Sequence, residues 1–167
     1  MKKIILTMLA LGISALVPPM NAADKSAPAT TPADAPAVTP GKWTADYKAA
    51  AAAAKAENKL LLLDFTGSDW CGWCIKLDKE VFNTPEFKAY AQENLILVKL
   101  DFPRRKTLPA ATKKQNDALG KKYGIEGFPT IIILNSAEKK VGELGYMQGG
   151  PKAFIAALDK LKAKAKK

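Results

Sequence analysis

The only two cysteines of the chain, Cys71 and Cys74, lie three positions apart in the segment GSDWCGWCIKL. Zinc binds four ligands, and a chain with two cysteines and no histidine cannot complete such a site by itself. A structural disulfide across so short a loop would remove little entropy from the unfolded chain. A strand-like segment precedes the pair and a helix-like segment follows it, and this placement favours thiol–disulfide exchange.

Continuous apolar runs predict the strands that must position the two cysteines. Runs without polar alternation indicate strands buried on both faces, as in parallel sheets. The short SAEK connection after the third run indicates an antiparallel hairpin partner. The predicted strands are KLLLLDFTG (59–67), LILVKLDF (95–102), TIIILN (130–135) and KKVGELGYM (139–147).

Helical segments are predicted between and around these strands. An Ala-rich helix is expected from Trp43, and a helical region after Cys71 is expected to break near NTPEF, where Thr84 suits a helix cap and Pro85 a first helical position. Further helices are expected over 110–123 and from Pro151 onward. The order α-β-α-β-α-β-β-α predicts one α/β sandwich.

The N-terminal quarter is predicted to lie outside this domain. Lys2 and Lys3 precede an apolar stretch over 4–17, and Ala22 and Ala23 offer a cleavage site, which is typical of a signal peptide over 1–23. The alternative, a membrane anchor, is disfavoured because a spanning helix needs about 20 apolar residues. We expect an Ala/Pro/Thr-rich linker over 24–42 and a folded domain over 43–167.

The net charge of +10 is concentrated in two places, RRK at 104–106 and the tail after Leu158. We interpret both as solvated surface, and the alternative is attraction to an anionic membrane or to acidic client proteins. Neither cluster has interleaved aromatic residues, which argues against nucleic-acid binding.

Three segments in a fixed order resemble the thioredoxin superfamily: LLLDF ahead of WCGWC, LVKLDF, and YGIEGFPTIIIL. The resemblance extends from about Trp43 to the end of the chain. It implies a thioredoxin-like sandwich, with a central mixed sheet flanked by helices. It also implies a thiol–disulfide oxidoreductase with a redox-active CxxC disulfide.

The resemblance assigns roles to individual residues. Cys71 would be the nucleophile and Cys74 the resolving thiol, while Asp64 would relay protons to Cys74 with Lys99 modulating its charge. The alternative for Asp64 is an acid at a strand end that reaches solvent. The expected substrate-binding residues are Trp70, Gly72, Trp73, Phe128, Pro129 and Gly145. The proline is expected to be cis, the alternative being a trans proline at a strand start.

The sequence also departs from the thioredoxin pattern. Trp73 replaces the usual proline between the cysteines, and Lys79 replaces a helix-kinking proline. One extra residue separates Asp64 from Cys71, and PRRKTLPAATKKQND lengthens the connection after the second long strand. These changes alter the surface around the cysteines, so they leave client choice open.

The predicted function is an exported protein that reduces or isomerises disulfides of client proteins. The chain has no histidine to stabilise a reduced thiolate, which favours a reductase or isomerase over an oxidant. Expected partners are disulfide-containing exported proteins and a membrane thiol reductase as electron donor, in the periplasm or outside the cell, with no cofactor, metal or nucleic acid. The alternative is a client-binding or chaperone module on the same fold without redox turnover.

Overall fold

The computed structural model describes residues 38–165, so the predicted signal peptide and most of the predicted linker lie outside the described residues. Within that range no helix combines the length and apolarity that crossing a membrane requires. The elements are β1 (Trp43–Thr44), α1 (Tyr47–Glu57), β2 (Leu60–Thr66), α2 (Gly72–Leu77), the π-helix η1 (Asp78–Phe82), α3 (Pro85–Asn94), β3 (Leu95–Asp101), α4 (Ala110–Tyr123), β4 (Thr130–Leu134), β5 (Lys140–Leu144) and α5 (Gly150–Ala165).

The five strands form one mixed sheet in the order β1-β3-β2-β4-β5. Strand β3 runs parallel to both β1 and β2, whereas β4 is antiparallel to β2 and β5 is antiparallel to β4. The predicted central strand and the predicted hairpin are therefore confirmed. The cysteines therefore follow a strand that is hydrogen-bonded to a neighbouring strand on each side.

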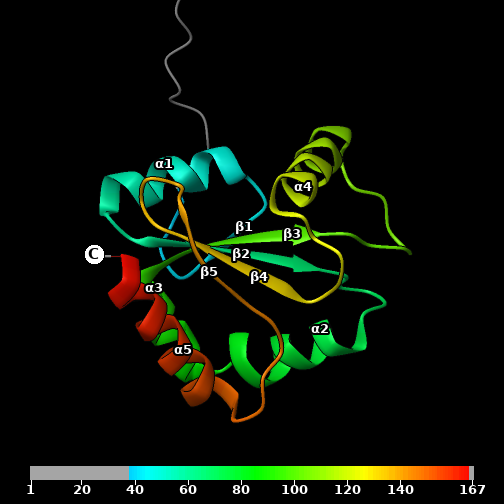
Figure 1. The fold of residues 1–167 in the computed structure, drawn as a ribbon. Helices are drawn as coiled ribbons and strands as arrows, with labels where there is room; N and C mark the ends of the chain where they lie inside the picture. The colour runs from blue at the N-terminus through cyan, green and yellow to red at the C-terminus, as the bar shows by residue number, and fades with distance from the viewer. Residues whose placement is uncertain (1–37, 166–167) are drawn as a thin grey trace, which may run out of the picture. The chain divides into compact units, whose positions relative to one another are not determined.

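Helices cover both faces of the sheet, with α1 and α4 on one face and α2, α3 and α5 on the other (Figure 1). Strand β2 supplies both cores: Leu61 and Leu63 pack in the cluster with α1, and Leu60 and Leu62 pack in the cluster with α3 and α5. All seven residues of β2 are buried. This two-sided burial explains the continuous apolar run, since successive side chains of a strand point to opposite faces.

The start of the domain differs from the sequence prediction. The helix expected from Trp43 begins at Tyr47, with Asp46 as its cap, whose carboxylate accepts the backbone N–H of Ala49. Residues Trp43–Thr44 instead form the edge strand β1, which pairs with β3. The physical reason is tertiary: the Trp43 ring packs against Phe82, at 5.2 Å between ring centroids, and this contact lies far away in sequence.

The helical region after the cysteines is interrupted as predicted. Thr84 caps α3 and Pro85 occupies its first turn. The sequence did not predict that α2 runs directly into the five-residue π-helix η1. Lys79, one of the departures from the thioredoxin pattern, lies in this π-helix, and π-helical turns of this kind are often found at functional sites.

Candidate active site

The cysteine pair opens helix α2, directly after the loop that leaves β2. Cys71 is the N-cap residue of α2, and its Sγ accepts the backbone N–H of Cys74 at 3.2 Å. The two cysteines form a disulfide. Cys71 is 7% exposed and Cys74 is 3% exposed, so burial separates them little. Their positions distinguish them, because only Cys71 stands where unpaired amides and the helix dipole stabilise a negative sulfur.

Asp64 is buried in the middle of β2 and is 3% exposed, so the alternative of a solvated strand-end acid is wrong. Its Oδ1 has no hydrogen-bond partner. Burial raises the pKa of the Asp64 carboxyl to about 7; Lys99 opposes this rise, while Asp78 and Asp101 add to it. By strand alternation Asp64 faces the layer that contains α2, the helix of Cys74.

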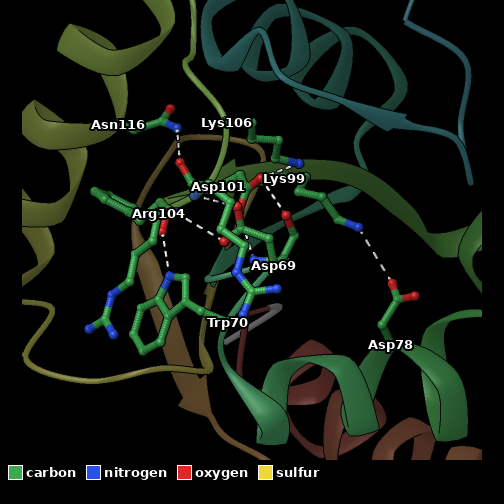
Figure 2. Close-up of polar contacts among 11 residues, drawn as sticks. Asp69, Trp70, Asp78, Lys99, Asp101, Arg104, Lys106 and Asn116 are labelled. Atoms are coloured by element: carbon green, nitrogen blue, oxygen red, sulfur yellow. Dashed lines mark hydrogen bonds and ion pairs between the residues drawn. The ribbon is translucent and has the colours of Figure 1, made fainter.

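Lys99 lies opposite Asp64 in the register of β2 and β3. Its ammonium group contacts Asp78 rather than Asp64: Nζ lies 3.4 Å from Oδ1 of Asp78 (Figure 2). It also lies 5.3 Å from the centroid of the Trp43 ring. Lys99 therefore acts on Asp64 through space, and the carboxyl of Asp64 is left without a hydrogen bond from it.

The loop between β2 and Cys71 is held by the end of β3. Asp101 accepts hydrogen bonds from the backbone N–H of Ser68 at 2.9 Å and from the Ser68 hydroxyl at 2.7 Å. Burial works against ionisation of Asp101, but these hydrogen bonds and Lys106 leave its pKa below the usual value. The indole N–H of Trp70 donates to the carbonyl of Phe102 at 2.8 Å. The loop that presents Cys71 is thus fastened at two points.

Sequence reasoning missed this fastening. Ser68 and Asp69 lie in the lengthened loop between Asp64 and Cys71; Ser68 contacts the last residue of β3, and Asp69 contacts the segment after it. The available signal was the coincidence of two departures from the thioredoxin pattern, the longer loop before Cys71 and the longer connection after β3. Two insertions that face each other in the fold are expected to pack together.

Four of the predicted substrate-binding residues lie together. The Trp70 and Phe128 rings meet edge to face, with centroids 5.8 Å apart at 87°. The Phe128–Pro129 peptide bond is cis, as the resemblance implies. A Cβ placed on Gly145 would lie 3.7 Å from the Pro129 carbonyl oxygen, so Gly145 lies beside this turn.

The other two predicted residues, Gly72 and Trp73, project from the first turn of α2. Trp73 is 58% exposed, the highest value among the large apolar side chains of the described residues. Its ring packs against Tyr146 at 5.0 Å between centroids, and the Lys76 ammonium lies over both rings. Tyr146 in turn donates its hydroxyl hydrogen to Glu80. Tyr146 and Lys76 were not predicted from sequence, because their contact with Trp73 depends on the fold.

Two features define the thioredoxin class of fold. A cysteine pair opens a helix after the central strand of a mixed sheet, and a cis proline lies at the start of a neighbouring strand. Among the described residues no cluster of three potential metal ligands accompanies it. A family model described as "Thioredoxin-like domain" matches residues 47–162. The chain belongs to this thioredoxin-like family.

The names of individual relatives indicate thiol–disulfide chemistry. The chain is 34% identical over 110 residues to the disulfide bond reductase DsbH of Chlamydia pneumoniae, with 66% of each chain covered. It is 33% identical over 103 residues to the thioredoxin-related protein DsbJ of the same organism, covering 62% of this chain but 30% of DsbJ. A solved structure titled "DsbH Oxidoreductase" superposes with a TM-score of 0.69 at 32% identity, covering 78% of this chain and 88% of the other. The chain is therefore homologous to thiol–disulfide oxidoreductases.

Proposed function

We propose that this protein is an exported thiol–disulfide oxidoreductase that reduces or isomerises disulfides in client proteins. The observation that carries the proposal is the Cys71–Cys74 disulfide at the first turn of α2, with the Cys71 sulfur accepting the Cys74 N–H. A disulfide at this place can be opened and re-formed without disturbing the sheet. The similarity to a disulfide bond reductase supports the same chemistry.

The reaction begins with the reduced pair. The Cys71 thiolate, stabilised by the start of α2, attacks one sulfur of the client disulfide. The client S–S bond breaks, a Cys71–client mixed disulfide forms, and the client's other sulfur leaves as a thiolate that takes up a proton. The number of disulfide bonds is unchanged at this stage, because the mixed disulfide has replaced the client disulfide.

Cys74 completes the transfer. It gives up its proton, and its sulfur attacks Cys71, which forms the Cys71–Cys74 disulfide and releases the second client sulfur as a thiol. Two electrons have then passed from the protein to the client. Asp64 is the proton acceptor that we assign to this step, because a carboxyl whose pKa is raised to about 7 exchanges protons near neutral pH. An external dithiol must reduce the protein again for the next turnover.

Clients are proposed to bind on both sides of the pair. Trp70, Phe128, Pro129 and Gly145 form one side, and Gly72 and Trp73 form the other. The backbone next to a cis proline can pair with an extended client segment. Trp73 adds exposed apolar area, which supports contact with unfolded or partly folded clients.

We assign electron flow toward the client. Trp73 stands between the cysteines where an oxidant would benefit from a positively charged histidine, and the chain contains none. A reduction potential below about −180 mV is expected, set against about −120 mV for a strong oxidant. The N-terminal segment 1–23 is proposed to direct export, after which a membrane thiol reductase would supply electrons in the periplasm or at the cell surface.

Two measurements test this proposal. Insulin reduction with a dithiol donor should be accelerated by the wild-type protein and abolished by Cys71→Ser, whereas a chaperone module would show no turnover in either case. Equilibration with graded glutathione ratios, followed by counting free thiols, gives the potential. A value near −120 mV would show that the protein is an oxidant and would overturn the assigned direction.

A further inference from the structure

The segment after β3 lies against the loop that presents Cys71. The Asp69 carboxylate accepts the backbone N–H groups of Arg104 at 3.0 Å and Arg105 at 2.8 Å (Figure 2). These hydrogen bonds, that from Arg104 foremost, hold the pKa of Asp69 below its usual value. Together with the hydrogen bond from Trp70 to Phe102, they fix the backbone of this basic segment beside the active site.

Asp69 binds the backbone of the two arginines, and their side chains remain available. The guanidinium carbon of Arg104 lies 3.7 Å from the centroid of the Trp70 ring. Both arginines are exposed, and within residues 38–165 neither guanidinium group has a nitrogen within 4.0 Å of a carboxylate oxygen. The next residue, Lys106, differs because it pairs with Asp101 at 3.0 Å.

The stacking determines what Arg104 can bind. A guanidinium group held over an aromatic ring by its carbon atom still presents N–H donors along its edge, in the fork geometry that matches a carboxylate. Its position is also set by the ring on which it lies, so less side-chain freedom is lost when an anion binds. Trp70 immediately precedes Cys71, and an anion bound here would therefore belong to the molecule that Cys71 attacks.

We propose that Arg104 and Arg105 form a docking surface for an acidic segment that flanks the disulfide of the partner protein. This inference rests on the proposed function and deepens it, because it names the chemistry that the surface selects. The sequence alone favoured solvated surface for the RRK cluster. The fixed backbone, the stacked guanidinium and the absence of a carboxylate partner within residues 38–165 favour a binding role instead. A membrane surface fits less well, since the Arg104 charge lies on the ring of Trp70, the residue directly before Cys71.

The test uses two synthetic peptides that each contain one intramolecular disulfide and differ only beside it, with two glutamates in one and two glutamines in the other. The reduced wild-type protein is mixed with each peptide, and the second-order rate of reduction is followed by rapid quenching. At low ionic strength the glutamate peptide should react about fivefold faster, as expected for two exposed ion pairs. At about 0.5 M salt the preference should largely disappear.

The double variant Arg104→Gln/Arg105→Gln should lose this preference. Asp69 would still bind the backbone of the segment, so the fold is expected to persist and can be checked by urea unfolding. The matched control is Lys160→Gln/Lys164→Gln, which removes two exposed positive charges from the C-terminal part of α5. This control should keep the preference, because the two lysines lie near the end of the sheet opposite the cysteines. Lys162, between them, contacts Asn94 just before β3 begins, whereas the cysteines follow the end of β2, which runs parallel to β3.

The outcomes separate the inference from the proposed function. If neither peptide is reduced, the proposed function is wrong. If both are reduced at equal rates by the wild-type protein, the function stands and the docking surface is refuted. Loss of the preference in the lysine control as well would show an effect of net charge and would overturn the assignment to the arginines. Binding to anionic lipid vesicles that needs the arginines, without a peptide preference, would assign the surface to membranes instead.

Discussion

Replacing Asp64 by Asn should stabilise the oxidised protein at alkaline pH and not at acidic pH. The substitution keeps the size of the side chain and removes a buried charge. Oδ1 of this carboxylate has no hydrogen-bond partner. Burial raises the pKa of Asp64 from 3.8 to about 7. A shift of about 3 units corresponds to about 4 kcal/mol of folding free energy lost when the carboxyl is ionised.

The sign of the pH dependence follows from proton binding. Below about pH 4 the carboxyl is protonated in both the folded and the unfolded chain, so burial of the charge costs nothing. Between about pH 4 and pH 7 the unfolded chain loses its proton while the folded chain keeps it, and the stability of the wild type falls as pH rises. Above about pH 7 both states are ionised, and the loss is complete.

The asparagine variant avoids this loss but brings an amide that needs partners. An unpaired buried donor costs about 1–3 kcal/mol. The variant should therefore be more stable than the wild type by about 1–3 kcal/mol at pH 8.5. At pH 4.5 the wild type has lost only about 1 kcal/mol, so the variant should be less stable there by about 0–2 kcal/mol. Titrations of Asp69 and Asp101 are common to both proteins and largely cancel in the difference.

Urea unfolding of the oxidised proteins at five pH values between 4.5 and 8.5 measures this difference. Asp117→Asn is the control, because its carboxylate forms an exposed pair with Lys113 on α4 and its loss should change stability by less than about 1 kcal/mol at every pH. A stability difference for Asp64→Asn that does not vary with pH would refute the reasoning. It would show that the Asp64 carboxyl is hydrated or paired in solution.

Two further predictions concern the cysteine pair and its loop. Cys74→Ser should accumulate mixed disulfides with client proteins, which are visible as covalent adducts on non-reducing gels. Cys71→Ser should form none. Adducts on Cys74 in the Cys71→Ser variant would reverse the assigned order of attack. Gly67→Ala should lower stability by about 1–3 kcal/mol and slow insulin reduction, because its Cβ would lie 2.5 Å from the Trp70 ring. Gly72→Ala is the control for unfolding, since a Cβ there meets no atom within 4 Å; equal destabilisation of both variants would contradict the contact.

Patterns that are local in sequence predicted most of the fold. The central position of β2 could be inferred because a sheet covered by helices on both faces needs apolar residues at consecutive positions, such as Leu62 and Leu63. The start of α3 could be inferred because Thr84 and Pro85 satisfy the first helical turn by themselves. Both features depend on neighbours within a few residues.

Contacts between distant segments could not be predicted in the same way. A two-residue strand such as Trp43–Thr44 carries no periodicity, and it depends on pairing with β3 and on the contact of Trp43 with Phe82. The register correctly places Lys99 opposite Asp64, but a long side chain can bend away from its strand neighbour, and here it reaches Asp78. The Asp69–Arg104 hydrogen bond joins two loops whose relative positions depend on the complete sheet.

The four aspartates of β2, β3, η1 and the loop before Cys71 differ in how fully their carboxylates are paired. Asp101 and Asp69 are committed to the loop before Cys71 and to the segment after β3, and hydrogen bonds hold the pKa of both below the usual value. Asp78 engages the ammonium that the register would otherwise offer to Asp64. Asp64 alone is left buried and without a hydrogen bond on one oxygen, and its pKa rises toward neutrality as a result. Fixed carboxylates thus hold the loop before Cys71 in place, and one uncompensated carboxyl is the group that we propose to change its protonation state during turnover.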